Sequence, residues 1–282
     1  MTSASTLATI GRYQINFIDT GQGPAVVLIH GLAGDYGAWQ AQINLLSSNY
    51  RVIAFDNRGA GRSTQTDEPV STADLAKDTL GLMDYLNIKQ AHVVGRSMGG
   101  AIAQHMALMA PERIISLALC ASFARLDPLG RRVLLNMREA LEWRMNWADH
   151  ARHSVQNFVS ARFFNEHPEQ IAAIERLIGG ETRLPACYSR QNEACQTHDT
   201  ISSLHKIRQR TLVMGGDCDP ICSMTATRAL LDGLPNSRAE IFADASHFFL
   251  MEQPEKFNRL LTEWLASQVA THLQKNYWIS SR

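Results

Sequence analysis

Short, mostly apolar runs alternate along this chain with segments whose apolar residues have helical spacing. A continuous apolar run bounded by turn residues is typical of a strand that is covered on both faces. An alternating, strand-like segment at Arg12–Asp19 comes first. The continuous apolar runs follow it at Ala25–Ile29, at Arg51–Phe55, in a segment that starts at Ala91, at Ile114–Cys120 and at Gln209–Met214. Helix-like segments separate them, at Ala38–Ser48, from Ser71 or Thr72 to Leu86, and at Ala101–Ala110. This alternation predicts an α/β fold with a mostly parallel sheet and helices on both faces.

The pattern changes in the middle of the chain, where strand signals disappear. Helix-like segments follow one another there, at Pro128–Asn146, Trp147–Phe164, Pro168–Ile178 and Pro185–Thr197. The strand and helix alternation then resumes, with a helix near Met224–Leu234, a strand at Arg238–Phe242 and a last helix from Pro254 to Ala270. We therefore predict an α/β core made of residues 1–122 and 206–282, with an all-helical cap at 123–205 over the carboxyl edge of the sheet.

Composition narrows the possible partners. Of the 282 residues, 45% are hydrophobic, and Lys plus Arg and Asp plus Glu both number 27, so the net charge is zero. A neutral chain gives no support for a nucleic-acid partner or a polybasic membrane surface. Residues 1–9 lack the basic and apolar regions of a signal peptide, and no apolar run approaches the roughly 20 residues of a membrane span.

The cysteines and histidines point away from metal and disulfide chemistry. The five cysteines are an odd number and lack Cys-x-x-Cys spacing, which disfavours both zinc and a disulfide framework and favours a reducing, cytoplasmic setting. His150 and His153 lie one helical turn apart with His167 nearby, but no acidic or cysteine ligand is in register with them. We expect packed or solvated histidines there and predict no metal.

The strongest candidate for chemistry is the Gly-x-Ser-x-Gly sequence at 95–99. It lies between an apolar strand and an apolar helix, so Ser97 is expected at the apex of a tight turn where its neighbours must be small. The hydroxyl would then lie at the carboxyl edge of the sheet beside a helix N-terminus, which favours negative charge.

A serine hydroxyl becomes a useful nucleophile only when a base takes its proton, and a carboxylate must orient that base. Ligands of parallel sheets bind at the carboxyl ends of the strands, so the base and the acid should lie in loops just after strands. His247 lies in such a loop. Asp217 and Asp219 both follow the strand at 209–214, and we favour Asp219 because Pro220 helps to fix its loop. The predicted catalytic residues are Ser97, Asp219 and His247.

The negative charge that develops on the substrate carbonyl needs backbone N–H donors. One should come from Met98, directly after the serine. The other should come from the glycine-rich loop after the strand at 25–29, most simply from Leu32.

The chain resembles the α/β-hydrolase fold superfamily from Tyr13 to Ala266. The motifs that carry the resemblance are His30-Gly31, Asp56-x-Arg58-Gly59-x-Gly61-x-Ser63, Gly95-x-Ser97-x-Gly99-Gly100, Gly216-x-x-Asp219-Pro220 and Ser246-His247. Within the superfamily it looks most like bacterial carboxylesterases and enol-lactonases, a group that includes 3-oxoadipate enol-lactonase and the aminoacrylate hydrolase of pyrimidine breakdown. The resemblance implies a serine hydrolase that cleaves a small ester or lactone through an acyl-enzyme. This mechanism needs no cofactor, and the sequence leaves open whether the protein is a monomer or a homodimer.

Other activities remain compatible with the same residues. They are hydrolysis of a carbon–carbon bond, perhydrolysis without a cofactor, and a binding or signalling role in which the triad survives without turnover. A serine rather than an aspartate at position 97 disfavours dehalogenase and epoxide hydrolase chemistry.

The role of the arginines near the site can be interpreted in two ways. If Arg96 or Arg125 points into the pocket, the substrate carries a carboxylate, because guanidinium groups bind carboxylates in a bidentate manner. The alternative, which we favour from sequence alone, is that Arg96 bonds backbone beneath the turn and the ten cap arginines pair with the ten cap acids. Arg58 and His30 are expected to tie loops together.

Overall fold

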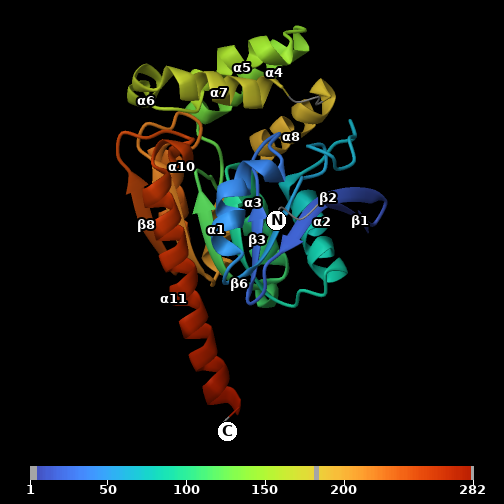
Figure 1. The fold of residues 1–282 in the computed structure, drawn as a ribbon, viewed down its shortest axis with the longest axis vertical. Coiled ribbons are helices and arrows are strands. Elements are labelled where there is room, and N and C mark those ends of the chain that lie inside the picture. The colour runs from blue at the N-terminus through green and yellow to red at the C-terminus, as the bar shows by residue number, and fades with distance from the viewer. Residues whose placement is uncertain (1–4, 181–183, 281–282) are drawn as a thin grey trace.

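A central sheet with helices on both sides forms the body of the protein, and a layer of helices covers one end of it (Figure 1). The computed structural model describes residues 5–180 and 184–280, with side chains up to residue 268. None of the helices in this described part is both long enough and apolar enough to cross a membrane.

Within the described residues, the sheet has eight strands in the order β1-β2-β4-β3-β5-β6-β7-β8. β2 runs antiparallel to β1 and β4, and every pairing from β4 to β8 is parallel, so the predicted mostly parallel sheet is confirmed. The strands are β1 (Thr6–Ile10), β2 (Tyr13–Thr20), β3 (Ala25–Ile29), β4 (Arg51–Phe55), β5 (Ala91–Arg96), β6 (Ile114–Cys120), β7 (Arg210–Gly216) and β8 (Ser237–Phe242).

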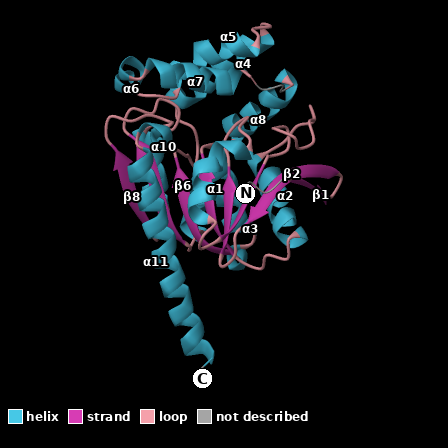
Figure 2. Cartoon of the chain, in the orientation of Figure 1, coloured by secondary structure: helices cyan, strands magenta, loops and turns pink. Residues whose placement is uncertain are grey.

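Helices cover both faces of this sheet, as Figure 2 shows. The core helices are α1 (Gln40–Leu46), α2 (Thr72–Tyr85), α3 (Met98–Met109), α9 (Met224–Gly233), the short α10 (Phe249–Glu252) and α11 (Pro254–Ser280). Successive residues of a strand point to opposite faces. Val27 and Ile29 accordingly pack in the apolar cluster that contains residues of α2 and α3, whereas Val26 and Leu28 pack with residues of α1 and α11. Burial on both faces explains why these strands are continuously apolar.

The segment between β6 and β7 forms α4 (Pro128–Glu142), α5 (Trp147–Ser154), α6 (Ala161–Glu166), α7 (Pro168–Gly179) and α8 (Pro185–Thr197). We call these the cap helices, and they lie over the carboxyl ends of the parallel strands (Figure 1). The predicted single helix at Trp147–Phe164 is wrong. Ser160 has an extended backbone and caps α6 by accepting from the N–H of Phe163, which divides the segment into α5, a 3-10 turn at Val155–Asn157 and α6.

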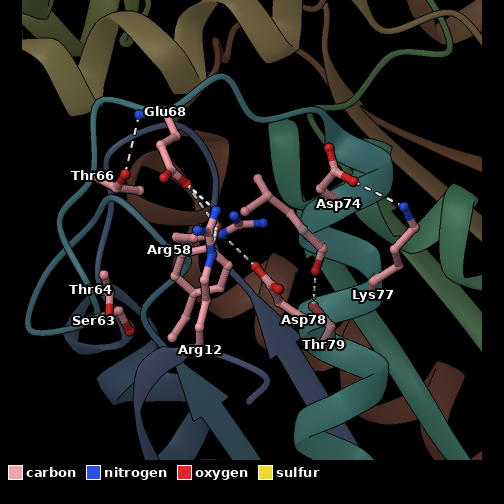
Figure 3. Close-up of polar contacts among 12 residues, drawn as sticks. Arg12, Arg58, Ser63, Thr64, Thr66, Glu68, Asp74, Lys77, Asp78 and Thr79 are labelled. Carbon is pink, nitrogen blue, oxygen red and sulfur yellow. Dashed lines mark hydrogen bonds and ion pairs between the residues drawn. The ribbon is translucent and has the colours of Figure 1, made fainter. Parts of the chain in front are cut away.

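The Asp56-x-Arg58 motif has a structural role. Figure 3 shows the Arg58 guanidinium joined to Asp78 of α2, with Nε 2.9 Å from Oδ2. The guanidinium also lies 3.9 Å from the centre of the Tyr13 ring. Both charged side chains are nearly buried, at 7% and 12% exposed. Arg58 thus ties the loop after β4 to α2 and to the antiparallel edge of the sheet, as expected from the sequence.

Candidate active site

Ser97 lies at the tight turn between β5 and α3, with φ of 54° and ψ of −122°. A residue with a side chain rarely adopts a backbone conformation with positive φ, so the surrounding structure must hold Ser97 in it. The neighbouring glycines explain how. A Cβ on Gly95 would lie 2.3 Å from the carbonyl oxygen of Gly99, and a Cβ on Gly99 would lie 2.2 Å from that of Ile29. Only glycine allows β5, α3 and β3 to approach so closely around the serine.

His247 and Asp219 meet at the carboxyl edge of the sheet, in the loops after β8 and β7. Nδ1 of His247 lies 2.8 Å from Oδ2 of Asp219, and both side chains are buried. The backbone N–H groups of Ile221 and Cys222 donate to Oδ1 of Asp219 at 2.7 and 2.9 Å. Because a carboxylate accepts hydrogen bonds, this contact places the proton of a neutral imidazole on Nδ1 and leaves Nε2 free of it.

Asp217, the alternative acid, lies elsewhere. Its carboxylate accepts from the thiol of Cys218, and both residues are exposed. The structure therefore brings Asp219, and not Asp217, to His247.

Two backbone amides near Ser97 have no hydrogen bond among the described residues. They are the N–H of Leu32, in the loop after β3, and that of Met98, at the first position of α3. The loop packs directly on the serine, since a Cβ on Gly31 would lie 2.9 Å from Cβ of Ser97. These are the two donors expected from the sequence.

A cap residue that the sequence analysis did not single out holds this loop. Gln191 of α8 is 1% exposed, its Oε1 accepts from the N–H of Ala33 at 2.8 Å, and its Nε2 donates to the carbonyl of Arg58 at 2.7 Å. Ala33 has a φ of 59°, so a contact from the cap fixes an unfavourable conformation next to Leu32. No local pattern marks Gln191, because its role depends on how α8 docks.

The cap also contacts the loop that carries His247. Oε2 of Glu252 in α10 accepts from the hydroxyl of Ser160 at 2.6 Å, and its Oε1 accepts from the N–H of Ser246 at 2.8 Å. The N–H of Phe248 donates to the carbonyl of Phe158 at 2.7 Å, and their rings stack with centres 4.7 Å apart. The cap is therefore bonded to both loops that flank Ser97.

A cavity of about 350 Å³ lies between the cap and the sheet, and Ser97 and His247 both line it. Most of its other lining residues are apolar or aromatic, among them Leu32, Leu134, Met137, Trp147, Phe158, Leu177, Ile178, Tyr188, Ile221, Phe248 and Leu250. His150 of α5 belongs to this wall. Its ring packs against Trp147 and Tyr188, and Nε2 lies 3.0 Å from the carbonyl oxygen of Met137, so it is a packed cap residue.

The two arginines proposed to bind substrate lie in different places. Arg96 lines the cavity and is 4% exposed. Arg125 pairs with Asp199 at 3.2 Å, its side chain is 54% exposed, and it is not among the cavity residues. The expectation that Arg96 bonds backbone is also wrong, since the only hydrogen-bond partner found for its guanidinium in the described part of the chain is the ring of His30.

Cys222 lies next to Ser97, a neighbour that the sequence did not indicate. Its thiol contacts Ser97, and burial, with the charge of Asp219 as a second cause, raises its pKa well above the usual value, so the sulfur stays protonated. Within the described residues, Asp219, Cys222 and His247 are the one group of possible metal ligands whose donor atoms lie within 4.8 Å of one another. A metal bound through Nδ1 of His247 would displace the proton that this nitrogen shares with Asp219.

The sequence from residue 24 to residue 254 matches the family model described as the alpha/beta hydrolase fold. The chain belongs to the α/β-hydrolase fold family. It is 30% identical over 248 residues to 3-oxoadipate enol-lactonase 1 of Acinetobacter baylyi, an alignment that covers 86% of this chain and 89% of the lactonase.

Solved structures of hydrolases share this α/β-hydrolase architecture. An esterase from Thermogutta terrifontis with malate bound superposes with a TM-score of 0.83 at 28% identity, covering 94% of this chain and 99% of the esterase. The enol-lactonase from Burkholderia xenovorans superposes with a TM-score of 0.84 at 26% identity, covering 93% of this chain and all of that one. The chain is thus a hydrolase of the enol-lactonase-like group.

Proposed function

We propose that this α/β-hydrolase cleaves small esters or lactones, with Ser97 as nucleophile, His247 as base and Asp219 as the acid that orients the base. One observation carries the proposal. Nδ1 of His247 lies 2.8 Å from Asp219, which leaves the other ring nitrogen for a substrate proton, and His247 and Ser97 line the same cavity.

The chemistry follows from these positions. Nε2 of His247 takes the hydroxyl proton as Oγ of Ser97 attacks the carbonyl carbon, and Asp219 stabilises the imidazolium that forms. When the carbon–oxygen bond breaks, His247 gives the proton to the departing alkoxide. Water, activated by the same nitrogen, then hydrolyses the acyl-enzyme and restores the serine. Every group that this sequence needs is a side chain of the protein, so the proposal invokes no cofactor.

The N–H groups of Leu32 and Met98 are proposed to hold the oxyanion. Both lack another partner in the described structure. Met98 directly follows Ser97, and Leu32 follows Gly31, whose backbone packs against Ser97. The N–H of Ala33 is already donated to Gln191, which favours Leu32 as the donor from that loop. Removal of one such donor costs about 3–4 kcal/mol of transition-state stabilisation in a well-studied hydrolase.

The cavity and the relatives support the substrate class. A volume of about 350 Å³ with mostly apolar walls suits a small ester or lactone. Two of the similar proteins are named enol-lactonases and one is named an esterase. The five cysteines are all free thiols, which is consistent with a proposed cytoplasmic setting.

The test is a hydrolysis screen over aryl esters, lactones and acidic enol compounds, with Ser97→Ala beside the unmodified protein. We expect turnover that falls by at least about 10⁴-fold in Ser97→Ala. Ser189→Ala, which changes a cap serine near the surface, is the matched control and should keep full activity.

A fluorophosphonate probe separates the remaining outcomes. Labelling at Ser97 together with turnover supports the proposal. Labelling without turnover on any substrate would favour the binding or signalling alternative, and full activity in Ser97→Ala would end the proposed mechanism.

A further inference from the structure

Arg96 brings a full positive charge to a place where the fold gives it no negative partner. It is the last residue of β5, directly before Ser97, and its side chain is 4% exposed. Its Nη1 donates to Nε2 of His30 at 3.2 Å, and its guanidinium carbon lies 4.1 Å from the centre of the Phe248 ring. These neighbours position the group without neutralising it.

Within the part of the chain that the structure describes, Arg96 takes part in no ion pair. Its Nε is buried and has no hydrogen-bond partner among these residues. Of the carboxylates, only Asp219 contributes to its electrostatic environment, and that side chain already accepts from His247 and two backbone amides. Burial lowers the pKa of the guanidinium to about 10, which leaves it charged at neutral pH.

A buried charge without a partner is costly unless something else pairs with it. Arg96 borders the cavity that Ser97 and His247 also line. The other walls of that cavity are mostly apolar, and the carboxylate among its lining residues, Asp35, has the wrong sign to bind an anion, so the guanidinium of Arg96 is the group that would attract one.

We propose that Arg96 binds a carboxylate of the substrate, so that this hydrolase acts on esters or lactones that carry a carboxylate a few bonds from the carbonyl that Ser97 attacks. Because Arg96 and Ser97 border the same cavity of about 350 Å³, the carboxylate and the attacked carbonyl belong to one small substrate. A monoanion matches the single guanidinium, whereas a dianion would leave a negative charge unpaired near Asp219. The inference rests on the proposed function for its catalytic meaning, but anion binding by Arg96 can be tested separately.

The kinetic test uses two substrates that differ only in charge, 4-nitrophenyl hemisuccinate and its methyl ester. Arg96→Met keeps the length of the side chain and removes its charge. We expect the ratio of kcat/KM on the hemisuccinate to kcat/KM on the methyl ester to fall by about 10–100-fold, the range for a charge-assisted hydrogen bond. Arg96→Lys, which keeps the charge without the planar fork, should give an intermediate loss on the acid.

Equal losses on both substrates, or no loss on the hemisuccinate, would overturn the proposal and make Arg96 a structural residue. If Arg96→Met does not fold, Arg96→Lys answers the same question with the same pair of substrates.

A binding measurement separates this inference from the proposed reaction. Ser97→Ala is titrated with butanoate and with butanamide, which have the same shape but different charge. We expect the acid to bind at least about tenfold more tightly, and we expect that preference to be reduced by Arg96→Lys. The absence of a preference refutes the inference even if esters are hydrolysed. A preference in a chain that hydrolyses nothing supports Arg96 as the anion site while refuting the proposed function.

Discussion

Replacing Gln191 by methionine tests whether the cap helps to build the proposed oxyanion hole. Methionine has nearly the same shape as glutamine, but it can neither accept from the N–H of Ala33 nor donate to the carbonyl of Arg58. Both backbone groups would lose a buried partner, while the packing of α8 would be largely kept.

The size of the effect follows from these two contacts. A buried polar group without a partner costs about 1–3 kcal/mol, so the pair sets an upper range of about 2–6 kcal/mol for the loss of stability. The left-handed backbone of Ala33 adds a further reason for the loop to relax, since that conformation costs about 1–2 kcal/mol in an L-residue. Relaxation would move the N–H of Leu32, and complete loss of one oxyanion donor lowers kcat by about 10²–10³-fold. We expect kcat to fall by about 10–100-fold with little change in KM.

Asn192→Leu is the matched control, because Asn192 is the next residue of α8 and is also a buried amide. Its Nδ2 donates to the carbonyl of Leu134, a contact that stays within the cap. Both variants should unfold at lower urea concentration, but only Gln191→Met should lose kcat on 4-nitrophenyl acetate. A Gln191→Met protein that keeps kcat within about twofold would show that the loop holds its shape without the cap. Equal losses of kcat in both variants would show a general effect of destabilising α8.

The remaining predictions concern the acid, a buried ion pair and pH. Asp219→Asn should lower kcat by about 10⁴-fold, whereas Asp217→Asn should change it by less than about twofold in the same ester assay. Asp78→Leu should leave Arg58 buried without its partner and lower the free energy of unfolding by about 3–5 kcal/mol in urea titrations, with kcat of the folded protein unchanged. Burial lowers the pKa of His198 to about 3, so between pH 6.5 and 3 the unfolded chain binds a proton there that the folded chain does not. The free energy of unfolding should therefore decrease as pH falls through that window, and His198→Asn should weaken the dependence; an unchanged slope would contradict this reasoning.

Strands in the middle of the sheet could be read from the sequence because burial on both faces makes them continuously apolar. The predicted ranges of β3, β4 and β6 agree with the structure at both ends. β1 was not predicted, because at the edge of the sheet it buries only Ala8, and one buried position gives no pattern. The division of the second cap helix was missed because the capping role of Ser160 is a local hydrogen bond within an otherwise helix-like segment.

The candidate catalytic residues could be proposed from sequence because the order of strands decides which loops meet at the carboxyl edge. Their catalytic roles stay predictions, although the structure brings His247 to Asp219 and to the cavity of Ser97. Gln191 and Glu252 could not be found, because their partners lie far away in the chain and become neighbours only when the cap docks. For the same reason, the contacts of Arg96 with His30 and Phe248 could not be predicted from the sequence.

The hydrogen bonds from Gln191 to the loop after β3 and from Ser160 to Glu252 of α10 have a consequence for protein engineering. One way to change the substrate selectivity of such a hydrolase is to replace its cap with the cap of another hydrolase. In this chain a foreign cap would remove the acceptor for Ala33 and the donor for Glu252 together with the walls of the cavity. A chimera should therefore lose turnover even when the new walls fit the intended compound, unless the graft carries a glutamine and a serine at these two positions.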